Sequence, residues 1–566
     1  MKTIRWAVVA ACLSLLAACG GGGGGGKKPN PTPQAETPTE TPPEVVPQSA
    51  TYAVVLSDAV DTPYGYQLDI VDPSTAQLLR SIRIDQYDAW RTTLSRQQSS
   101  DGRSLTYQHE AALYYVYGQR VYAVDLTRGS STQPRQMSSI ADACRILWHV
   151  DSDLSGEHSW LAIVRAGNDA DCATSSDDAF ALIPSNLPAT TAADPVPFNV
   201  AQLVTVGRNA AGGLESLITF EPVFSQFVHW RLDSLGAHPT SVSNGNGFSA
   251  NADIHWLGMV PGLRDRGILE INGSLRMLTW DGLGATLSAN LASGVVANGS
   301  HGLLVATDST RLYVIAQEPG QAIFAFDGTS TASRIAALDA TKGDATELLV
   351  SSDAVWVVQK DQAVPNAPTT LTSFTKSAGM SRQLDHYEVP TGLPLDIGLS
   401  LAGVNGTQLV YAKPSDLDDD DPVALYVVDN IGASPRLLAA RVLGIGTHQA
   451  PTALIGQARD VTRLLWCDLG TPSSPVDCTA ARFKGYNLLT GTVTALGQHL
   501  VGAEASALLD FAHLGNNHGL NAFITTARMD YPAGGGSPSL TTTLWQFKPD
   551  KAGSLSLIAR DGIGMP

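Results

Sequence analysis

The densest cluster of metal-type ligands in this sequence is the acidic segment 416–421, which carries five carboxylates in six residues. Hard cations such as Ca²⁺ take oxygen ligands, so Asp416, Asp418 and Asp420 are the candidate ligands of a calcium site. The segment does not fit an EF-hand loop, because its sixth residue is Asp421 where that loop needs glycine. Adjacent aspartates also point in different directions. The pattern therefore favours a solvated acidic loop over a metal site, and no other cofactor is expected.

Other residues of catalytic type occur without the partners that their chemistry needs. His513 and His518 could meet at one metal ion, but the segment is interpreted as a connection between strands and no third ligand lies nearby. The pair His109-Glu110 begins like a zinc-protease helix and fails at Leu113, where the second histidine should stand. The sequence has neither a GxSxG nucleophile elbow nor a CxxCH haem site. It therefore predicts no catalytic residue.

The amino-terminal segment has the composition of an export signal. Lys2 and Arg5 precede an apolar run that is too short to cross a bilayer, which takes roughly 20 residues. The run ends in Leu16-Ala17-Ala18-Cys19, which resembles the lipobox of bacterial lipoproteins. This resemblance implies that residues 1–18 are removed and that the new amino-terminal Cys19 is acylated on its thiol and its amine. Several acyl chains give a stable membrane anchor where one chain does not.

The segment after the cysteine predicts a tether. Residues 19–49 are rich in glycine and proline and have little apolar surface to offset the entropy cost of ordering, so we expect a flexible linker. Gly20 and Gly21 follow the cysteine where some lipoproteins have aspartate, and this resembles the pattern of lipoproteins sent to the outer membrane. Residues 50–566 then form the folded body, facing either the periplasm or the cell exterior.

Composition excludes one class of partner. The formal net charge is −17, and only 16% of the residues are charged. An acidic surface repels nucleic acid, so nucleic-acid binding is not expected. Valine, leucine, threonine, serine and alanine dominate the rest of the chain, and this balance suits many short strands.

The cysteines predict two disulfides. Of the six cysteines, four follow Cys19 in the folded body. An even number in an exported chain indicates disulfide bonds, and the sequence-local pairing joins Cys144 to Cys172 and Cys467 to Cys478. Zinc is the rival interpretation, but the chain contains no CxxC pair.

One strand-rich unit recurs along the body, with successive copies 47 to 60 residues apart. Such a period with strand signals only is typical of an all-β fold, the β-propeller, in which each blade is a four-stranded antiparallel sheet. The pattern predicts about eight to ten blades. They could form an eight-bladed ring with two units misassigned, one unusually large ring or two smaller rings. The clearest copies are Tyr66–Asp72, Arg120–Asp125, Ala322–Asp327 and Ala424–Asp429, and weaker copies are Ala179–Pro184, Phe227–Leu232, Ser274–Asp281, Thr370–Lys376, Lys484–Leu489 and Thr543–Lys548.

The first copy resembles a known repeat. The segment from Leu68 to Leu79, with Asp72 before a proline, resembles the repeat of YVTN-type and quinoprotein-like propellers, and this resemblance implies the same fold. The aspartate that ends several copies could be functional, but aspartate before glycine, proline or serine is ordinary turn chemistry. We therefore interpret it as a turn residue.

The expected blade also predicts which face carries function. If the strands of a blade are called A to D, the start of strand A and the loop between strands B and C lie on the same face. Cys144 would open a strand A and Cys172 would lie in the next B–C loop, while Cys467 and Cys478 would flank another B–C loop. Long loops fall at this position, so we expect the binding face there.

Two functions from different classes fit these features. The favoured one is a scaffold, anchored in the outer membrane by lipid, that binds another envelope protein or a secreted polymer. The alternative is a lyase or hydrolase acting on a glycan or peptide in a central channel. Trp230, Trp256 and Trp280 could line a sugar site there, although tryptophans in strands usually belong to the core. A quinone-dependent dehydrogenase fits less well, because the chain lacks vicinal cysteines and a clear set of metal ligands.

Overall fold

The chain divides into two units, Met1–Gln48 and Ser49–Pro566, and the residues that can be described all belong to the second unit. The lipobox around Cys19 and the whole of the predicted tether, residues 19–49, lie outside the described residues. The structure, a computed structural model, describes residues 52–58, 66–84, 106–109, 112–151, 159–166, 172, 179–184, 196–198, 202–208, 214–221, 226–233, 236–244, 254–261, 263, 265–281, 284–293, 297–298, 302–317, 320–329, 331–364, 366–377, 379–389, 398–415, 422–443, 453–455, 463–470, 478–502, 506, 511–514, 522–530, 539–548 and 550–558.

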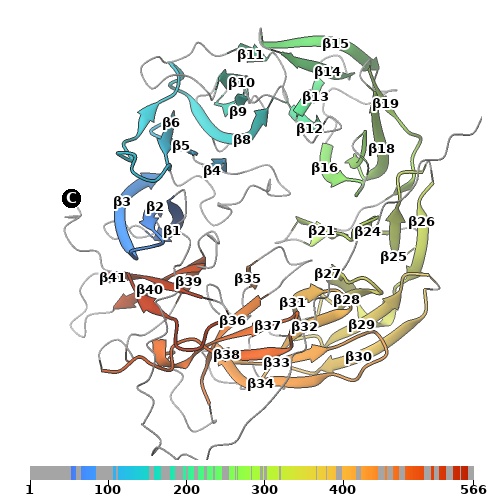
Figure 1. Ribbon diagram of the computed structural model, residues 1–566. Coiled ribbons are helices and arrows are strands. Elements are labelled where there is room, and N and C mark those ends of the chain that lie inside the picture. Colours follow the sequence, from blue (N-terminus) through green and yellow to red (C-terminus); the bar gives the residue numbers. More distant parts are fainter. Residues whose placement is uncertain are drawn as a thin grey trace, which may run out of the picture. The chain divides into compact units, whose positions relative to one another are not determined.

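The described residues form strands almost throughout (Figure 1). The strands of the first half are β1 (Ala53–Asp58), β2 (Tyr66–Asp72), β3 (Gln77–Ile84), β4 (Thr106–His109), β5 (Ala112–Tyr117), β6 (Arg120–Asp125), β7 (Arg135–Gln136), β8 (Ala143–Asp151), β9 (Ser159–Arg165), β10 (Ala179–Pro184), β11 (Val196–Phe198), β12 (Gln202–Arg208), β13 (Leu214–Glu221), β14 (Gln226–Asp233), β15 (Gly236–Asn244), β16 (Ile254–Met259), β17 (Arg266–Ile271), β18 (Ser274–Asp281), β19 (Gly284–Leu287), β20 (Ala292–Ser293), β21 (Ala297–Asn298) and β22 (Gly302–Leu303).

The strands of the second half are β23 (Val305–Thr307), β24 (Leu312–Gln317), β25 (Gln321–Phe326), β26 (Ser333–Ala337), β27 (Asp344–Val350), β28 (Ala354–Lys360), β29 (Thr369–Thr375), β30 (Ser381–Tyr387), β31 (Ser400–Asn405), β32 (Gln408–Pro414), β33 (Val423–Val428), β34 (Arg436–Leu443), β35 (Ala453–Ile455), β36 (Arg463–Asp468), β37 (Phe483–Asn487), β38 (Thr492–Ala495), β39 (Phe511–Leu514), β40 (Ala522–Asp530), β41 (Ser539–Phe547) and β42 (Ser556–Leu557). The described helical segments are two 3-10 turns, η3 (Ala340–Lys342) and η4 (Ala480–Arg482), and no helix among the described residues is long and apolar enough to cross a membrane.

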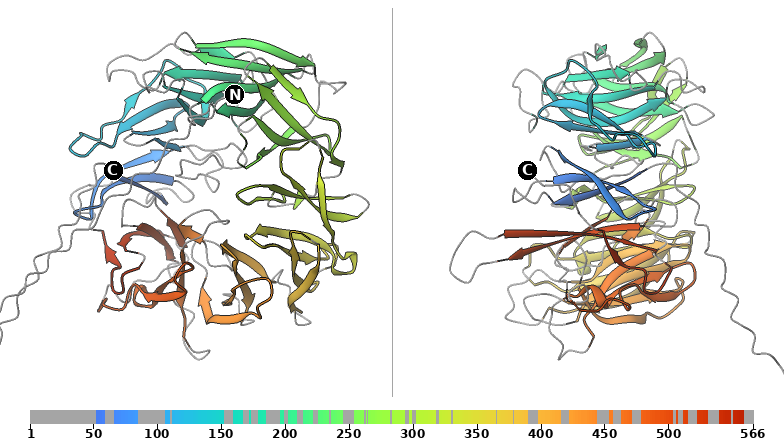
Figure 2. Two further views of the ribbon diagram at one scale, coloured as in Figure 1. Left: turned by 45° about the vertical axis from the view of Figure 1, so that its right-hand side comes forward. Right: turned by 60° about the vertical axis from the view of Figure 1, so that its left-hand side comes forward.

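Within the described part of the chain, the strands form ten antiparallel meanders, each made of strands that follow one another in sequence; outside them, β20 pairs with β18, and β21 pairs with β22. The strands of a meander lie side by side and twist relative to one another (Figure 2). We keep the letters A to D for the four strands of a meander. The meanders are β1–β3, β4–β7, β8–β11, β12–β15, β16–β19, β23–β26, β27–β30, β31–β34, β35–β38 and β39–β42.

The repeat read from the sequence coincides with these meanders. Each of the ten predicted copies overlaps strand C of one meander, for example β6 at Arg120–Asp125 and β25 at Gln321–Phe326. By the same correspondence β2 is a strand C, so β1, β2 and β3 are strands B, C and D of the first meander. The all-β fold and the four-stranded antiparallel sheets predicted from the sequence are thus confirmed, whereas closure into one or two rings stays a prediction.

The aspartate at the end of strand C is a turn residue, as interpreted from the sequence. The carboxylates of Asp72, Asp125 and Asp327 each accept a hydrogen bond from the amide two residues further on, at 2.9, 2.8 and 3.0 Å. Asn487 accepts the same bond through its side-chain oxygen at 2.9 Å. Such Asx turns supply a local acceptor for the chain as it reverses toward strand D. The fourth clear copy differs, because Asn430 rather than the preceding aspartate makes this bond.

Consecutive meanders pack face to face through clusters of buried apolar side chains. Between β27–β30 and β31–β34, the fully buried Trp356 shares a cluster with Leu371, Tyr411 and Val428. Burying a large side chain of this kind stabilises the fold by about 2–3 kcal/mol. Stacked four-stranded meanders of this type are the blades of a β-propeller. The first and last meanders also share a cluster, which contains Val55 of β1 and Phe523 of β40.

One junction departs from the regular pattern. The last residues of β34 pair with β36 at Val442↔Asp468 and Leu443↔Cys467, so the meanders β31–β34 and β35–β38 merge into one sheet. The short strand β35 pairs with the other end of the same edge of β36. In a regular meander, one strand A pairs with this edge of strand B. Here the end of β34 and the short strand β35 pair with that edge of β36 instead.

One local expectation needs correction. The sequence analysis placed His513 in a connection between strands, but it lies within β39 and pairs with Thr525. The other histidine of that candidate metal pair, His518, lies outside the described residues. Single-sequence reading misses short edge strands such as β39 because four residues carry little periodicity.

Candidate functional site

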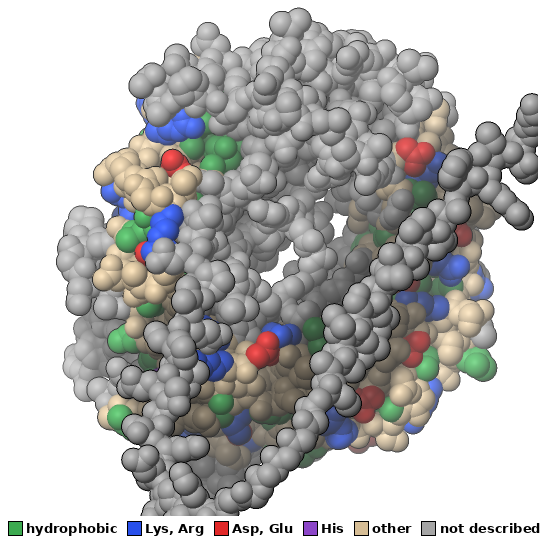
Figure 3. Space-filling view, viewed as in Figure 1, with side chains coloured by type: hydrophobic (Ala, Val, Ile, Leu, Met, Phe, Trp, Pro, Cys, Tyr) green, Lys and Arg blue, Asp and Glu red, His purple; other side chains and the backbone are tan. Residues whose placement is uncertain are grey.

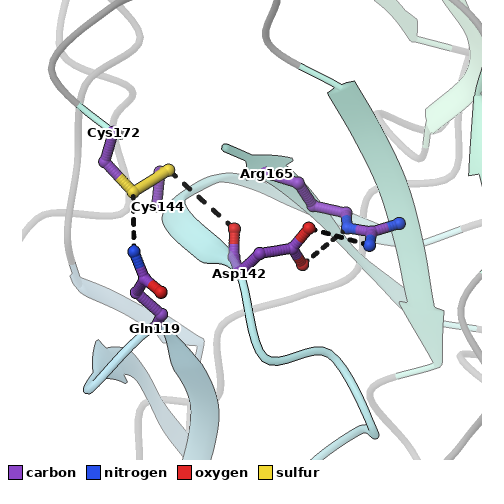
Figure 4. Close-up of a disulfide and its surroundings, with 5 residues drawn as sticks. All are labelled: Gln119, Asp142, Cys144, Arg165 and Cys172. Carbon is purple, nitrogen blue, oxygen red and sulfur yellow. Dashed lines mark hydrogen bonds and ion pairs between the residues drawn. A yellow bond between two sulfur atoms is a disulfide. The ribbon is translucent and has the colours of Figure 1, made fainter. Parts of the chain in front are cut away.

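The first predicted disulfide is present. Cys144, the second residue of β8, is bonded to Cys172, which lies in the B–C loop between β9 and β10, and their Cα atoms are 5.2 Å apart. Figure 4 shows the bond beside Gln119, whose side-chain nitrogen lies 4.0 Å from the Cys172 sulfur. Gln119 belongs to the β5–β6 turn, the B–C loop of the preceding meander. The disulfide therefore lies where two neighbouring meanders meet.

The start of β8 is held on both sides of this disulfide. The Ala143 amide donates to the Gln119 carbonyl at 2.9 Å, which joins β8 to the preceding meander. Within the same meander, the Arg165 guanidinium binds both carboxylate oxygens of Asp142, at 2.8 and 2.9 Å (Figure 4). A two-point Arg–carboxylate contact fixes orientation as well as distance. The start of strand A and the B–C loop are thus fixed relative to each other at one edge of the sheet.

The second predicted disulfide has the same position in its own meander. Cys467, near the end of β36, is bonded to Cys478 across the B–C loop, with a Cα separation of 5.8 Å. Both cysteines belong to a buried cluster that includes Phe483 and Trp545. The Arg482 guanidinium donates to the Leu469 carbonyl at 3.3 Å across the same loop. Both disulfides thus brace B–C loops, as the sequence analysis expected.

We call the edge of each sheet that holds its B–C loop and the start of its strand A the B–C edge. Residues 117–120 and 360–369 are B–C loops of this kind. Two of their side chains are large, apolar and exposed: Tyr117 is 43% exposed and Val364 is 50% exposed. In the view of Figure 3, the basic and acidic side chains of the described residues lie interspersed on the surface.

The candidate calcium ligands cannot be placed. Asp416, Asp418 and Asp420 lie outside the described residues, within the B–C loop that links β32 and β33. The base of that loop is described, and there both the amide and the hydroxyl of Ser415 donate to the Pro422 carbonyl, at 3.0 and 2.8 Å. In the part of the chain that the structure describes, no group of three histidine, cysteine, aspartate or glutamate side chains could hold a metal ion.

One hydroxyl, imidazole and carboxylate do come together at the B–C edge. The Thr370 hydroxyl lies 3.0 Å from Nδ1 of His386, and Nε2 of His386 lies 3.5 Å from the Glu388 carboxylate. The order of hydroxyl, imidazole and carboxylate matches that of a nucleophilic triad. However, Thr370 is only 3% exposed, whereas Glu388 is largely exposed. A nucleophile must reach its substrate. This arrangement therefore orders the edge of the sheet and offers no accessible nucleophile.

Beside this imidazole, a second polar cluster joins two meanders. The Asp385 carboxylate of β30 accepts hydrogen bonds from the Lys413 ammonium at 2.7 Å and the Tyr411 hydroxyl at 2.8 Å, both from β32 of the next meander. Lys413 also donates to the His386 carbonyl at 3.3 Å. Burial, followed by the hydrogen bond to Asp385, raises the pKa of Tyr411 far above its usual value, so its hydroxyl stays protonated and donates.

The sequence analysis missed one titratable residue, Glu347 of β27. The strand β27 begins at Asp344, and Glu347 lies inside it. Burial raises the pKa of Glu347 to about 7, although the hydrogen bond from the Leu401 amide lowers it in part. The signal available was a single charged residue in the otherwise uncharged run Ala345–Val350. The tryptophans considered for a sugar site, Trp230, Trp256 and Trp280, lie on β14, β16 and β18. The structure does not describe their side chains.

Comparison with known proteins shows no family. No known protein family and no curated protein matches the chain. Solved structures with distant similarity include dipeptidyl peptidase 4 of Porphyromonas gingivalis, with 9% identity, a TM-score of 0.37 and coverage of 82% of this chain and 59% of that one. They also include a periplasmic gluconolactonase of Pseudomonas aeruginosa, with 13% identity, a TM-score of 0.29 and coverage of 60% and 97%.

A third similar structure is the WD40 domain of SCAP from fission yeast, with 10% identity, a TM-score of 0.30 and coverage of 70% of this chain and 80% of that one. These three structures are those of a peptidase, a gluconolactonase and a WD40 domain. At these TM-scores none of them assigns an activity to this chain, because one fold supports many functions.

Proposed function

We propose that this protein is a lipid-anchored β-propeller of the outer membrane that acts as a scaffold, binding another envelope protein or a secreted polymer through its B–C edge. The lipobox-like segment ending at Cys19 supports the anchor, and the glycine- and proline-rich residues 19–49 support a tether that carries the body away from the membrane. The body would be a single closed ring. The buried cluster shared by the first and last meanders supports this closure.

The observation that carries the proposal is the common position of the two disulfides. The Cys467–Cys478 bond closes a B–C loop, and the Cys144–Cys172 bond ties a B–C loop to the start of strand A of the same meander. The turns after Asp327 and Asn487, between strands C and D, are held by Asx-type hydrogen bonds. A covalent bond at a loop reduces the conformational freedom that the loop would lose on binding. Loops positioned on a rigid scaffold are the usual carriers of binding function. The B–C edge therefore suits recognition of a partner.

The test is affinity capture from crosslinked cell envelopes, with a tagged wild-type protein and a Cys19→Ala variant as the matched control. The variant keeps the whole folded body and should lose only the acylated residue. The proposal predicts membrane fractionation of the wild type alone, together with a defined envelope protein or polymer that the variant does not recover. Equal membrane association of the two proteins would contradict the anchor, and turnover of a glycan or peptide by the purified body would contradict a purely scaffolding role.

A further inference from the structure

The two central strands of the last meander, β39–β42, are longer than the strands on either side of them. β40 and β41 pair over nine residues each, without a register shift, as far as Asp530↔Ser539. β39 covers only residues 524–527 of β40, and β42 covers only residues 545–546 of β41. In the right-hand view of Figure 2 this long hairpin, in red, reaches beyond the neighbouring strands.

The outer edge of β41 has no partner strand from residue 539 to residue 543 in the described part of the chain. The nearest hydrogen bond on this edge is donated by the Ile558 amide to the Leu544 carbonyl, at 2.9 Å. Because the backbone groups of successive residues point to alternate sides of a strand, those of Leu540 and Thr542 point to the same side as those of Leu544. Two amides and two carbonyls are therefore directed to the open edge.

The sequence of this edge lacks the features that keep edge strands apart. Residues 539–544 are Ser-Leu-Thr-Thr-Thr-Leu, with no charged residue, proline or glycine. Natural edge strands are usually protected by charges, by proline or by bulges. A two-stranded ribbon without a third strand is also only marginally stable in water. These features favour the addition of another strand at the open edge.

The chain's own continuation is a poor strand for this position. β42 ends at Leu557, and its extension along β41 would need residues 559–566. That segment contains Asp561, two glycines and Pro566. Aspartate, glycine and proline are depleted in strands. The covering strand is therefore expected from another molecule.

We propose that the covering strand is β41 of a second copy of this chain, paired antiparallel about a two-fold axis at Thr541. In this register Leu540 exchanges backbone hydrogen bonds with Thr542 of the second copy, and Ser539 lies opposite Thr543. The paired residues carry no charge, and cross-strand Thr–Thr and Thr–Ser pairs stabilise antiparallel sheets. The two-fold arrangement covers both open edges at once, whereas a foreign strand covers one.

The open edge lies at the B–C edge of the last meander, because β40 and β41 are its strands B and C. Pairing of two copies therefore joins the B–C edges of two bodies. The association itself does not depend on the scaffold function proposed above.

Cysteine crosslinking of the full chain in intact cell envelopes tests the association. The four described cysteines are consumed by two disulfides, so a cysteine introduced into β41 adds a free thiol to the body. Residues opposite each other in a non-hydrogen-bonded pair have Cα atoms about 4.5 Å apart, which a disulfide can bridge. Thr541→Cys, oxidised with diamide, should therefore give a dimer on a non-reducing gel that reductant returns to the monomer.

Two further variants test the register. The cysteines of Ser539→Cys and of Thr543→Cys each lie about 14 Å from the same residue of the second copy, so neither variant alone should form a dimer. Co-expressed, the two variants should form one, because Ser539 lies opposite Thr543. The matched control is Thr526→Cys on β40, which is one strand further from the axis and should stay monomeric. Absence of the Thr541→Cys dimer, or an equal dimer from Thr526→Cys, overturns the proposal.

Sedimentation of the detergent-extracted protein tests the same pairing without an introduced thiol. The wild type should sediment as a dimer. Thr542→Pro removes an amide that points to the open edge and not to β40, so this variant should fold and sediment as a monomer. A monomeric wild type overturns the proposal, and so does a Thr541→Cys disulfide to a different protein, which would identify a foreign strand at this edge.

Discussion

A single carboxylate can hold two meanders together when it satisfies several donors. Asp308 follows β23, and its carboxylate accepts hydrogen bonds from the Lys376 ammonium at 2.5 Å and from the Tyr313 hydroxyl at 2.8 Å. Lys376 belongs to the C–D turn of the next meander, and its ammonium lies 5.4 Å from the centre of the Tyr313 ring. The amides of Thr310 and Arg311 also donate to Asp308, at 2.7 and 2.8 Å.

These donors determine the charge state of Asp308. Burial alone would raise its pKa, but the hydrogen bonds from Lys376, the Thr310 amide, Tyr313 and the Arg311 amide outweigh burial and hold the pKa well below its usual range. The carboxylate is therefore ionised at neutral pH and stabilises the fold there. Its contribution is present above the ordinary aspartate pKa of about 4 and is lost as pH falls below that value.

The Asp308→Asn variant should be markedly less stable at pH 7. It removes the partner of a mostly buried ammonium, and breaking a buried ion pair on one side costs about 2–4 kcal/mol. Urea unfolding at pH 7 measures the loss, and the stability of the variant should fall less than that of the wild type between pH 5 and pH 3.

The control is Asp429→Asn, because Asp429 makes a 3.6 Å ion pair with Arg436 in which both side chains are about half exposed. Exposed pairs of this kind contribute about 0–1 kcal/mol. Equal losses in the two variants would show that the Asp308 cluster does not clamp the meanders.

At the scale of single turns, two substitutions of Asp327 distinguish the stabilising effect of its Asx hydrogen bonds from that of its negative charge. Asp327 accepts hydrogen bonds from the amide and the hydroxyl of Thr329, at 3.0 and 2.7 Å, in an exposed turn. We expect Asp327→Ala to lower the free energy of unfolding by about 1 kcal/mol, because both bonds are lost. Asp327→Asn keeps an oxygen that accepts them and should lose less than about 0.5 kcal/mol. Equal effects of the two substitutions on urea unfolding would identify the charge, and not the turn, as the important feature.

The disulfides act at the scale of the loop. The Cys144–Cys172 bond spans 28 residues and the Cys467–Cys478 bond spans 11. In the chain-entropy model the longer loop contributes about 3.5 kcal/mol and the shorter about 3 kcal/mol. Replacing both cysteines of one pair by serine should lower the free energy of unfolding by these amounts, measured by urea unfolding without reductant. A wild-type protein that loses no stability in reductant, although its four thiols become titratable, would contradict a stabilising role.

Elements with a clear pattern could be predicted from the sequence, and irregular ones could not. Strands C such as Gln321–Phe326 were recognisable because they are apolar, short and followed by a turn residue at a constant period. The pairing of β34 with β36 was not recognisable, since no sequence signal marks where one strand passes from its own sheet to the next. Glu347 was missed for the related reason that the bulge before it shifts the strand alternation by one residue.

At the scale of the whole molecule, the stacking of meanders explains why the disulfide pairing could be predicted. Once strand order is fixed by the repeat, the start of strand A and the B–C loop must lie at one edge of the sheet, and so must Cys144 and Cys172. The same reasoning does not give a ligand, because the polar clusters at Asp308 and Asp385 each draw their members from two consecutive meanders. Contacts of this kind depend on packing between sheets, which no local pattern encodes.

Two edges of the same body can be compared in one experiment, because exposed apolar side chains lie on both. Tyr117 and Val364 lie at the B–C edge, whereas Met380, which is 66% exposed, and Leu489, which is 64% exposed, lie in turns between strands C and D. Substitution of each by a photoreactive amino acid leaves the buried core unchanged.

The measurement that tests the scaffold most directly is therefore site-specific photocrosslinking at these four positions in intact cell envelopes. A partner bound at the B–C edge predicts one defined crosslinked species from positions 117 and 364, and none from positions 380 and 489. The same species from all four positions, or from 380 and 489 alone, would contradict binding through the B–C edge.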